Sequence, residues 1–215
     1  MINVEIAWSQ IDTVLLDMDG TLLDLHYDNY FWRQHLPAIY GKQKNLSPQQ
    51  ALKELEPLFL KYSGTLDWYC VNFWSDKLQL DIMQHKNEVA DKIAYRPRAQ
   101  IFLENCRQHV TDLRLITNAH RKVLNLKIEH TKLDKYFDSL VCSHELNAPK
   151  EDLLFWQNLY EMKSFNATRT LFIDDSESVL DAAANYGIGH IYSIEQPDLS
   201  CQRVDTSKYQ MIKSI

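Results

Sequence analysis

The stretch that decides the fold is VLLDMDGTLLD, residues 14–24, in which an apolar run ends at two acidic residues. A continuous apolar run is typical of a parallel strand that is covered on both faces. Asp17 and Asp19 lie two positions apart, and residues at that spacing in an extended chain point the same way. Both carboxylates are therefore expected at the carboxyl edge of a sheet, where open α/β sheets bind ligands. Two adjacent carboxylates repel unless a proton or a cation separates them, and magnesium favours such a site.

The rest of the chain alternates between strand-like and helix-like patterns. Apolar and β-branched runs predict strands, and amphipathic patterns predict helices between them. The strands are expected at residues 13–16, 113–117, 139–142, 170–173 and 190–193, and the helices at 97–109, 120–130, 151–160 and 177–186. This alternation predicts βαβ units and hence an α/β fold with an open, Rossmann-like parallel sheet.

Residues 26–95 interrupt this alternation, because they contain no convincing strand run. Ser47, followed by Pro48 and by Gln50, has the pattern of a helix start with a capping box. Helical patterns continue from there, with breaks near residues 63–64 and near Asp81. We therefore predict a helical cap domain at 26–95, inserted after the first strand of a core domain formed by residues 1–25 and 96–215.

Composition narrows the class of protein. The chain has 215 residues, 45% of them hydrophobic, and a formal net charge of −6. This charge disfavours a basic groove for a nucleic-acid polymer, but a bound metal ion can still attract an anionic small molecule.

No apolar stretch approaches the ~20 residues of a membrane-spanning helix, so no membrane association is expected. Residues 1–5 show no start of a signal peptide, and a cytoplasmic location is expected. The four cysteines form no CxxC pair and are expected to be free thiols.

The first motif resembles the DxDGTLxD signature of the haloacid dehalogenase-like (HAD) hydrolases. Three later motifs of that family follow in the expected order. Thr117 comes at the end of a predicted strand, Lys150 precedes a predicted helix, and Asp174-Asp175-Ser176 follows an apolar strand. The four motifs together, each in its expected structural setting, carry the resemblance, which implies a HAD-like core with a helical cap.

The resemblance implies a role for each matched residue. Asp17 would be the nucleophile that forms an aspartyl-phosphate. Asp19 would be the general acid and later the general base, with its backbone carbonyl facing the metal. Thr117 and the backbone N–H of Asn118 would hold phosphoryl oxygens. Lys150 would neutralise charge on both the nucleophile and the phosphoryl group.

The fourth motif departs from the common Gly-Asp-Ser pattern, because Asp174 occupies the glycine position. Alignment on Ser176 makes Asp175 the expected magnesium ligand, with Asp174 as a neighbouring or alternative ligand. Asp24 is expected to bond turn backbone groups. His120 is expected to start a helix rather than to touch phosphate, and His26, whose contact with substrate is left open, lies where the chain leaves the site.

The predicted cap is rich in aromatic side chains: residues 26–80 hold 11 of the 24 in the chain. Two interpretations follow from this density. Most of these rings are expected to form the core of the cap. One or two are expected to stack on a nucleobase instead, and the candidates are Tyr27, Tyr30, Phe31, Trp68 and Tyr69.

Longer segments look like the bacterial GMP/IMP 5′-nucleotidase branch of the family. These segments are residues 17–32, 66–70, 117–120, 127–131 and 170–177. The HAD motifs imply a magnesium-dependent phosphomonoesterase, and this closer resemblance alone implies that its substrate is a purine mononucleotide. Alternatives are a sugar-phosphate phosphatase or a phosphomutase on the same site, and a non-catalytic HAD-fold binding protein.

Overall fold

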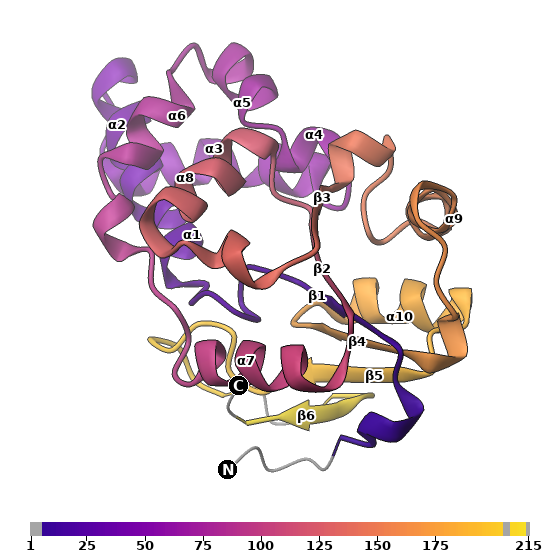
Figure 1. Cartoon of the computed structure of the whole chain (residues 1–215). Coiled ribbons are helices and arrows are strands. Elements are labelled where there is room, and N and C mark those ends of the chain that lie inside the picture. The colour runs from indigo at the N-terminus through magenta and orange to yellow at the C-terminus, as the bar shows by residue number, and fades with distance from the viewer. Residues whose placement is uncertain (1–5, 204–206, 214–215) are drawn as a thin grey trace.

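The core of the protein is a parallel sheet of six strands, seen in a computed structural model that describes residues 6–203 and 207–213. The strand order is β3-β2-β1-β4-β5-β6 (Figure 1). The strands are β1 (Thr13–Leu16), β2 (Asp112–Thr117), β3 (Ser139–Cys142), β4 (Thr170–Asp174), β5 (His190–Ile194) and β6 (Gln210–Ile212). All neighbouring pairs are parallel. The five predicted strands are confirmed, and the sixth, only three residues long, was not predicted.

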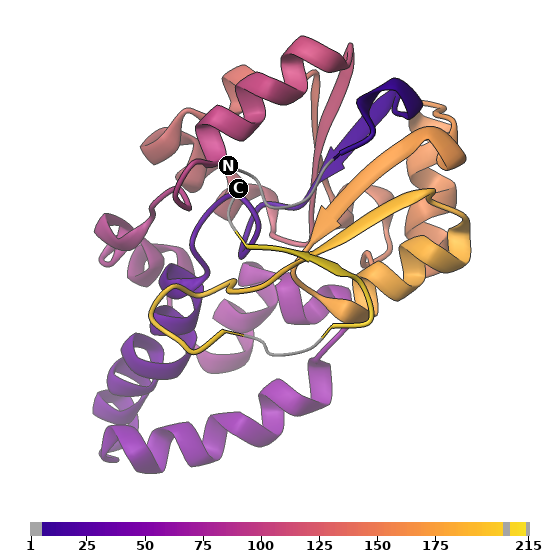
Figure 2. The same cartoon turned by 90° about the horizontal axis from the view of Figure 1, so that it is seen from below.

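Helices cover both faces of this sheet (Figure 2). The long core helices are α7 (Ala99–His109), α8 (Arg121–Thr131), α9 (Leu153–Met162) and α10 (Glu177–Tyr186). Val14 packs in one apolar cluster with Phe102 of α7 and Leu124 of α8. Its neighbour Leu15 points the other way and packs in a second cluster with Trp156 of α9. Alternation along β1 therefore buries both faces of the central strand, as its continuous apolar sequence predicts.

After the loop that follows β1, residues 26–92 are helical apart from short connections. Its helices are α1 (His26–Tyr30), a π-helical turn η2 (Phe31–His35), α2 (Leu36–Lys44), α3 (Pro48–Tyr62), α4 (Leu66–Tyr69), α5 (Val71–Leu78), α6 (Ile82–Asn87) and the 3₁₀ turn η3 (Ala90–Lys92). The predicted capping box is confirmed: the Ser47 hydroxyl accepts from the Gln50 backbone N–H, and the Gln50 side chain accepts from the Ser47 backbone N–H. The helices break at residues 63–65 and 79–81, close to the predicted positions.

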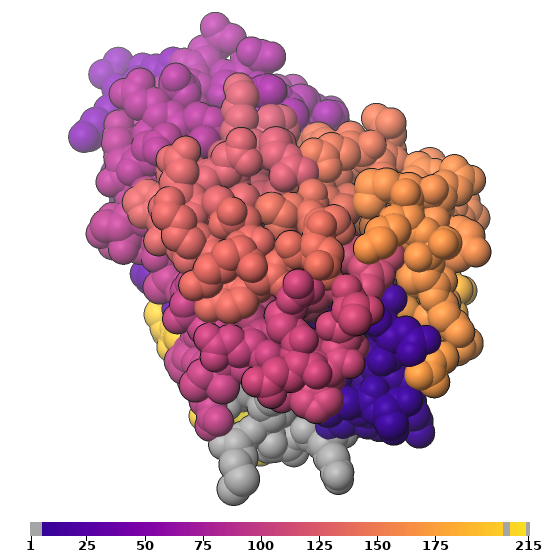
Figure 3. Space-filling model, in the orientation of Figure 1, coloured from indigo at the N-terminus to yellow at the C-terminus, as the bar shows by residue number. Residues whose placement is uncertain are grey.

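This helical cap has its own apolar core, and that core continues into the sheet domain. Phe31 and Trp74 are fully buried in a cluster that also contains Val123 and Leu126 of α8. The space-filling view shows the cap atoms lying directly against the segment that follows β2 (Figure 3). The cap is thus seated on α8, so that side chains of α8 contact both halves of the molecule.

Four short 3₁₀ turns complete the described chain: η1 (Trp8–Gln10), η4 (Leu133–Tyr136), η5 (Ser143–Leu146) and η6 (Ala167–Arg169). All four cysteines are free thiols, as expected. Among the described residues, no helix is both long and apolar enough to span a membrane. The prediction about a signal peptide concerned residues 1–5, which lie outside the described residues.

Candidate active site

Three strands deliver acidic and hydroxyl side chains to one edge of the sheet. Asp17 follows β1, Thr117 ends β2, and Asp174 ends β4 with Asp175 directly after it. One carboxylate oxygen from each of Asp17, Asp174 and Asp175 lies within 4.8 Å of the others. The first and fourth predicted motifs, 157 residues apart in sequence (17 to 174), therefore meet at the carboxyl edge that the topology predicts.

Lys150 lies among these carboxylates. Its Nζ donates to Asp17 Oδ1 at 2.5 Å and to Asp174 Oδ2 at 2.6 Å. The backbone on either side of its Cα is also fixed: the Lys150 N–H donates to Asn118 Oδ1, and its carbonyl accepts from Trp156 Nε1, both at 2.9 Å. The two carboxylates thus hold the ammonium, and the bonds from Asn118 and Trp156 hold the backbone that carries it.

Burial and repulsion disturb the titration of this cluster. Burial raises the pKa of Asp17 to about 6, although Lys150 acts against the rise. Burial also raises the pKa of Asp174, and burial together with repulsion from Asp174 and Asp17 raises the pKa of Asp175. Burial acts to lower the pKa of Lys150, but its two carboxylate partners outweigh burial and raise it. With all three carboxylates ionised, the single Lys150 ammonium would leave two negative charges for a proton or a cation to neutralise.

The donor set fits a hard divalent cation. Magnesium prefers carboxylate oxygens and keeps positions for phosphate oxygens and water. Asp175 is held against the first motif: a Cβ at Gly20 would lie 2.5 Å from Asp175 Oδ2. Gly20 also has φ +81°, so its lack of a side chain suits both the backbone and the close approach. The three carboxylates therefore form a candidate magnesium site that is tied to the loop after β1.

A second lysine joins the general-acid candidate to the cap. Lys127 Nζ, on α8, donates at 2.6 Å both to Asp19 Oδ1 and to Asp28 Oδ2 of α1. The other oxygen of Asp28 accepts from Lys86 of α6 at 2.8 Å. Both lysines are buried, and the Lys86 ammonium also lies over the Phe31 ring, 4.4 Å from its centre. Asp19 is thus linked to two cap helices through a chain of alternating charges.

The sequence analysis missed Asp28, Lys86 and Lys127 as site residues. Burial raises the pKa of Asp19 to about 6, while Lys127 acts to lower it. Burial would also raise the pKa of Asp28, but Lys127 and Lys86 outweigh burial and hold it well below its usual range. The available signal was a lysine on the inner face of the predicted helix at 120–130, where an apolar residue is usual.

The phosphate-binding candidates lie beside Lys150. Thr117 Oγ1 accepts from the Ala119 N–H at 3.0 Å, and the Asn118 amide donates to Glu151 Oε2 at 2.9 Å. The hydroxyl of Tyr69 donates to the other oxygen of Glu151 at 2.5 Å. Glu151 thus connects Asn118 with Tyr69 of cap helix α4. Its predicted role, donation from the backbone N–H to phosphate, stays a prediction.

A cavity of about 710 Å³ runs from these carboxylates to the cap. Its lining includes Trp68 and Tyr69 among the aromatic candidates for substrate contact. Tyr27 and Phe31 are 1% and 0% exposed, pack in the cap core, and do not line this cavity; nor does Tyr30. Substrate contact by these three rings stays a prediction. In the structure Tyr27 and Phe31 belong to the cap core, and Tyr30 packs against it. The polar cap side chains of the lining include Arg33 and Glu56, which were not predicted.

Three further residues behave as structural groups. Asp24 accepts backbone N–H groups from His26 and Leu199, as expected. His120 is the N-cap of α8 and accepts from the Lys122 N–H at 3.2 Å, as expected. His26 Nδ1 lies 3.1 Å from Ser200 Oγ, and His26 does not line the cavity.

The profile of the haloacid dehalogenase-like hydrolase family matches residues 14–192. The protein belongs to this family of hydrolases, as the four motifs, the parallel sheet and the helical cap after β1 indicate.

More specific relatives show which members of the family it is similar to. GMP/IMP nucleotidase YrfG of Escherichia coli K12 is 42% identical over 196 residues, which cover 91% of this chain and 88% of the relative. A phosphorylated carbohydrates phosphatase of Thermotoga maritima is 21% identical over 193 residues, 86% of this chain and 85% of the relative. The crystal structure of a HAD phosphatase from Thermococcus onnurineus has a TM-score of 0.75 at 21% identity and covers 94% of this chain and 93% of that one.

Proposed function

We propose that the protein is a magnesium-dependent phosphatase that hydrolyses purine 5′-mononucleotides such as GMP and IMP. The observation that carries this proposal is the bridging of Asp17 and Asp174 by the buried Lys150, within a cluster of three carboxylates at the base of a cap-covered cavity. The nucleotide preference rests on the similarity to the Escherichia coli GMP/IMP nucleotidase over most of the chain.

Magnesium would be held by the carboxylates of Asp17 and Asp175, with Asp174 beside them and the backbone carbonyl of Asp19 completing the set. Its charge would offset the repulsion between an anionic nucleophile and an anionic phosphate. The remaining chemistry falls to side chains of this chain.

In the first step, an Asp17 carboxylate oxygen attacks phosphorus, and the bond from phosphorus to the 5′ oxygen of the nucleoside breaks. Asp19 donates its proton to that departing oxygen. Its pKa of about 6, raised by burial, suits a group that must give and take a proton near neutral pH. Lys150 and Thr117 would hold the phosphoryl oxygens as charge develops on them.

In the second step, Asp19 accepts a proton from a water molecule, whose oxygen attacks the phosphorus of the aspartyl-phosphate. The bond between Asp17 and phosphorus breaks, and inorganic phosphate leaves. The nucleophile is thereby regenerated as a carboxylate, and Lys150, already hydrogen-bonded to Asp17 Oδ1, stabilises it.

The cap would supply the contacts to the nucleoside. Trp68 and Trp32 line the cavity and lie nearly parallel to each other, with ring centres 5.9 Å apart. An aromatic side chain contributes roughly 1–3 kcal/mol when a base stacks on it. Arg33 and Glu56 offer a donor and an acceptor for the polar edge of a purine.

The proposal is tested by measuring phosphate release with magnesium from GMP, IMP, AMP, CMP and glucose 6-phosphate. We expect the highest kcat/KM for GMP or IMP. Asp17→Asn, which is nearly isosteric, should fold normally and lose at least about 10³-fold in kcat, because an amide is a poor nucleophile. A preference for the sugar phosphate would favour a sugar-phosphate phosphatase. Conversion of a sugar phosphate to an isomer without phosphate release would favour a phosphomutase.

Base recognition is tested by comparing Trp68→Leu with Tyr27→Leu. Trp68→Leu should lower kcat/KM for GMP by about 5- to 150-fold and leave p-nitrophenyl phosphate nearly unaffected, because that small substrate lacks the base. Tyr27→Leu should instead lower the melting temperature, since Tyr27 is buried in the cap core. Equal losses on both substrates in Trp68→Leu would remove Trp68 from base recognition.

A further inference from the structure

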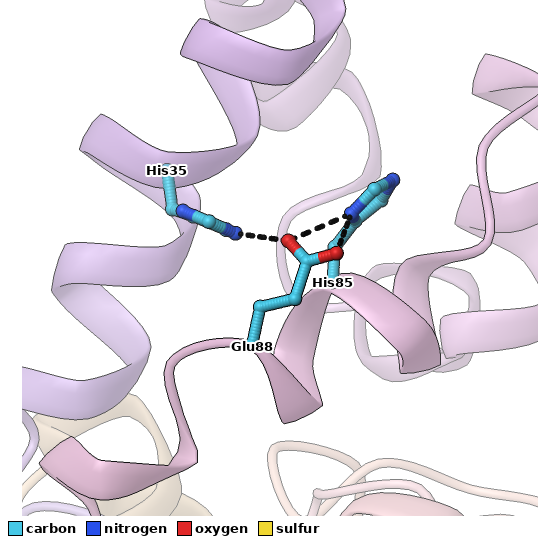
Figure 4. A group of neighbouring side chains, drawn as sticks. All are labelled: His35, His85 and Glu88. Carbon is cyan, nitrogen blue, oxygen red and sulfur yellow. Dashed lines mark hydrogen bonds and ion pairs between the residues drawn. The ribbon is translucent and has the colours of Figure 1, made fainter.

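Two histidines and a glutamate converge on the cap, outside the cavity described above (Figure 4). His35 comes from the end of η2, His85 lies on α6, and Glu88 follows the last turn of α6. Both imidazole rings point toward the Glu88 carboxylate, which lies between them. One donor atom from each of the three residues lies within 4.8 Å of the others.

The local structure explains this convergence. His85 and Glu88 are three residues apart and therefore share one face of the helix turn. His35 ends the π-helical turn Phe31–His35, and such a turn changes which residues face a neighbouring helix. The His35 ring also lies nearly parallel to the Tyr30 ring, with centres 6.4 Å apart. Two separate helical segments thus hold the three side chains in place.

Two of the three donor spacings are close to what a tetrahedral ion requires, and the third is within 4.8 Å. His35 Nε2 lies 3.0 Å from Glu88 Oε2, and His85 Nδ1 lies 3.1 Å from both Glu88 oxygens. Zinc bonds of about 2.0–2.1 Å at tetrahedral angles place neighbouring ligand atoms roughly 3.3 Å apart. The hydrogen bond from His85 lowers the pKa of Glu88, so that the carboxylate is an anionic donor at neutral pH. Small side-chain rotations would therefore replace the two hydrogen bonds with one ion.

The two histidines and the glutamate favour a different ion from the one that the carboxylates of the core favour. Imidazole nitrogens suit zinc and its neighbours among the transition metals, whereas carboxylates alone suit magnesium. Two histidines and one glutamate with a fourth position open are a known zinc ligand set. The side chains of His35 and His85 are 20% and 16% exposed, and Glu88 is 42% exposed, so an ion can reach them from solvent.

We propose that His35, His85 and Glu88 form a binding site for a divalent transition-metal ion of the zinc class, separate from the carboxylate site of the core. An ion there would join η2 to α6. Lys86 belongs to α6, and its ammonium lies over the Phe31 and Trp32 rings of η2 and pairs with Asp28. Metal binding would therefore stiffen the part of the cap that lines the cavity.

The test is zinc binding to chelator-treated protein with magnesium in excess, followed by equilibrium dialysis and by NMR of the histidine imidazoles. We expect one zinc per chain to bind outside the core site, with the His35 and His85 signals shifting. His35→Ala, His85→Ala and Glu88→Gln should each weaken this binding by about tenfold or more. His26→Ala removes another partly exposed histidine of the same cap and should leave the zinc affinity unchanged.

Two results would overturn the proposal. Zinc affinity that is equal in His35→Ala, His85→Ala and the unaltered protein would show that the ion binds elsewhere. NMR signals of His35 and His85 that do not respond to zinc would show the same without any variant. In either case the three side chains would form an ion-pair cluster only.

Discussion

The two buried lysines of the site make the same kind of contact in two different settings. Lys150 bridges Asp17 and Asp174, and Lys127 bridges Asp19 and Asp28, with all four distances at 2.5–2.6 Å. Both partners of Lys150 belong to the sheet domain. Lys127 has one partner in the loop after β1 and the other on cap helix α1.

The Lys150 bridge lies within the core, whereas the Lys127 bridge depends on where the cap lies. The Lys150 bridge joins two carboxylates of the core, and the bonds that fix the Lys150 backbone also come from core residues. The Lys127 bridge is complete only while α1 lies against α8. The position of Asp19, the proposed general acid, therefore depends on the contact between α1 and α8. Enzymes with a lid can use such a contact to complete the site around substrate.

Replacing each lysine by methionine tests most directly whether the two bridges differ in function. Lys150→Met should lower kcat by about 10²–10³-fold on every substrate, because it removes charge stabilisation at the phosphoryl group. Lys127→Met should lower kcat by about 10–10²-fold on GMP but far less on p-nitrophenyl phosphate, whose leaving group needs little protonation. Steady-state kinetics with both substrates provide the measurement.

The matched control for Lys127 is Lys122→Met on the same helix. Lys122 is exposed, and its Nζ donates to Asn72 rather than to the site. It should leave both activities unchanged. Equal losses on the two substrates in Lys127→Met would show that Lys127 does not act through the general acid.

Asp28→Asn should destabilise the protein, because it leaves two buried lysines short of a partner. Removing one member of a buried ion pair typically costs about 3–5 kcal/mol in the free energy of unfolding. The double variant Asp28→Asn/Lys86→Met should recover part of that loss, since one unpaired charge is removed as well. Urea unfolding of the four proteins in this cycle measures the coupling.

Asp91→Asn serves as the control for this cycle, because Asp91 is an exposed cap residue whose ion pair with Lys92 is 4.0 Å long. Its change should stay within about 0.5 kcal/mol. Strictly additive effects of Asp28→Asn and Lys86→Met would contradict a coupled chain of charges across the cap.

The smallest expected effect is a pH-dependent stabilisation by magnesium. The pKa of Asp17 is about 6 in the folded protein against 3.8 ordinarily, so the folded state binds this proton more tightly. The stability that this group contributes is therefore lost as the pH rises between about 4 and 6. Magnesium relieves the repulsion above that window, so it should raise the melting temperature by a few degrees more at pH 7.5 than at pH 5. Equal increments at the two pH values would contradict a metal site at these carboxylates, as would an unchanged increment in Asp175→Asn.

The core of this fold was predictable because its signals are local. The predicted strand at 139–142 agrees with β3, and the apolar run at 170–173 needed only Asp174 to complete β4. The positions of Asp17, Thr117 and Lys150 followed from motifs adjoining those elements. Each motif depends on a few consecutive residues, so no knowledge of distant contacts was needed.

The cap was less predictable, because long-range packing decides which of its charged and aromatic side chains are buried and which line the cavity. Tyr27 and Trp68 are both aromatic residues of the predicted cap, and nothing local in the sequence distinguishes their positions. Tyr27 is buried, whereas Trp68 lines the cavity. Asp28 and Lys127 are 99 residues apart. Both lie in segments that resemble the GMP/IMP 5′-nucleotidase branch, but nothing in the sequence indicates that they pair. Their pairing follows only from the seating of the cap on α8.

The insertion of the cap after β1 also has a consequence for the order of events during synthesis. Thr13 pairs with Asp112 and with Thr170, which follow it by 99 and 157 residues. At about 5–20 residues per second, β4 leaves the ribosome roughly 8–30 s after β1. The apolar central strand stays unpaired on the nascent chain while the whole helical cap, up to Lys92, is translated. The cap's own cluster also needs Val123 and Leu126, so the cap completes its core only after β2 has been made. The first strand to be translated thus waits longest for its second partner, and its apolar side chains stay without a complete sheet around them during that interval.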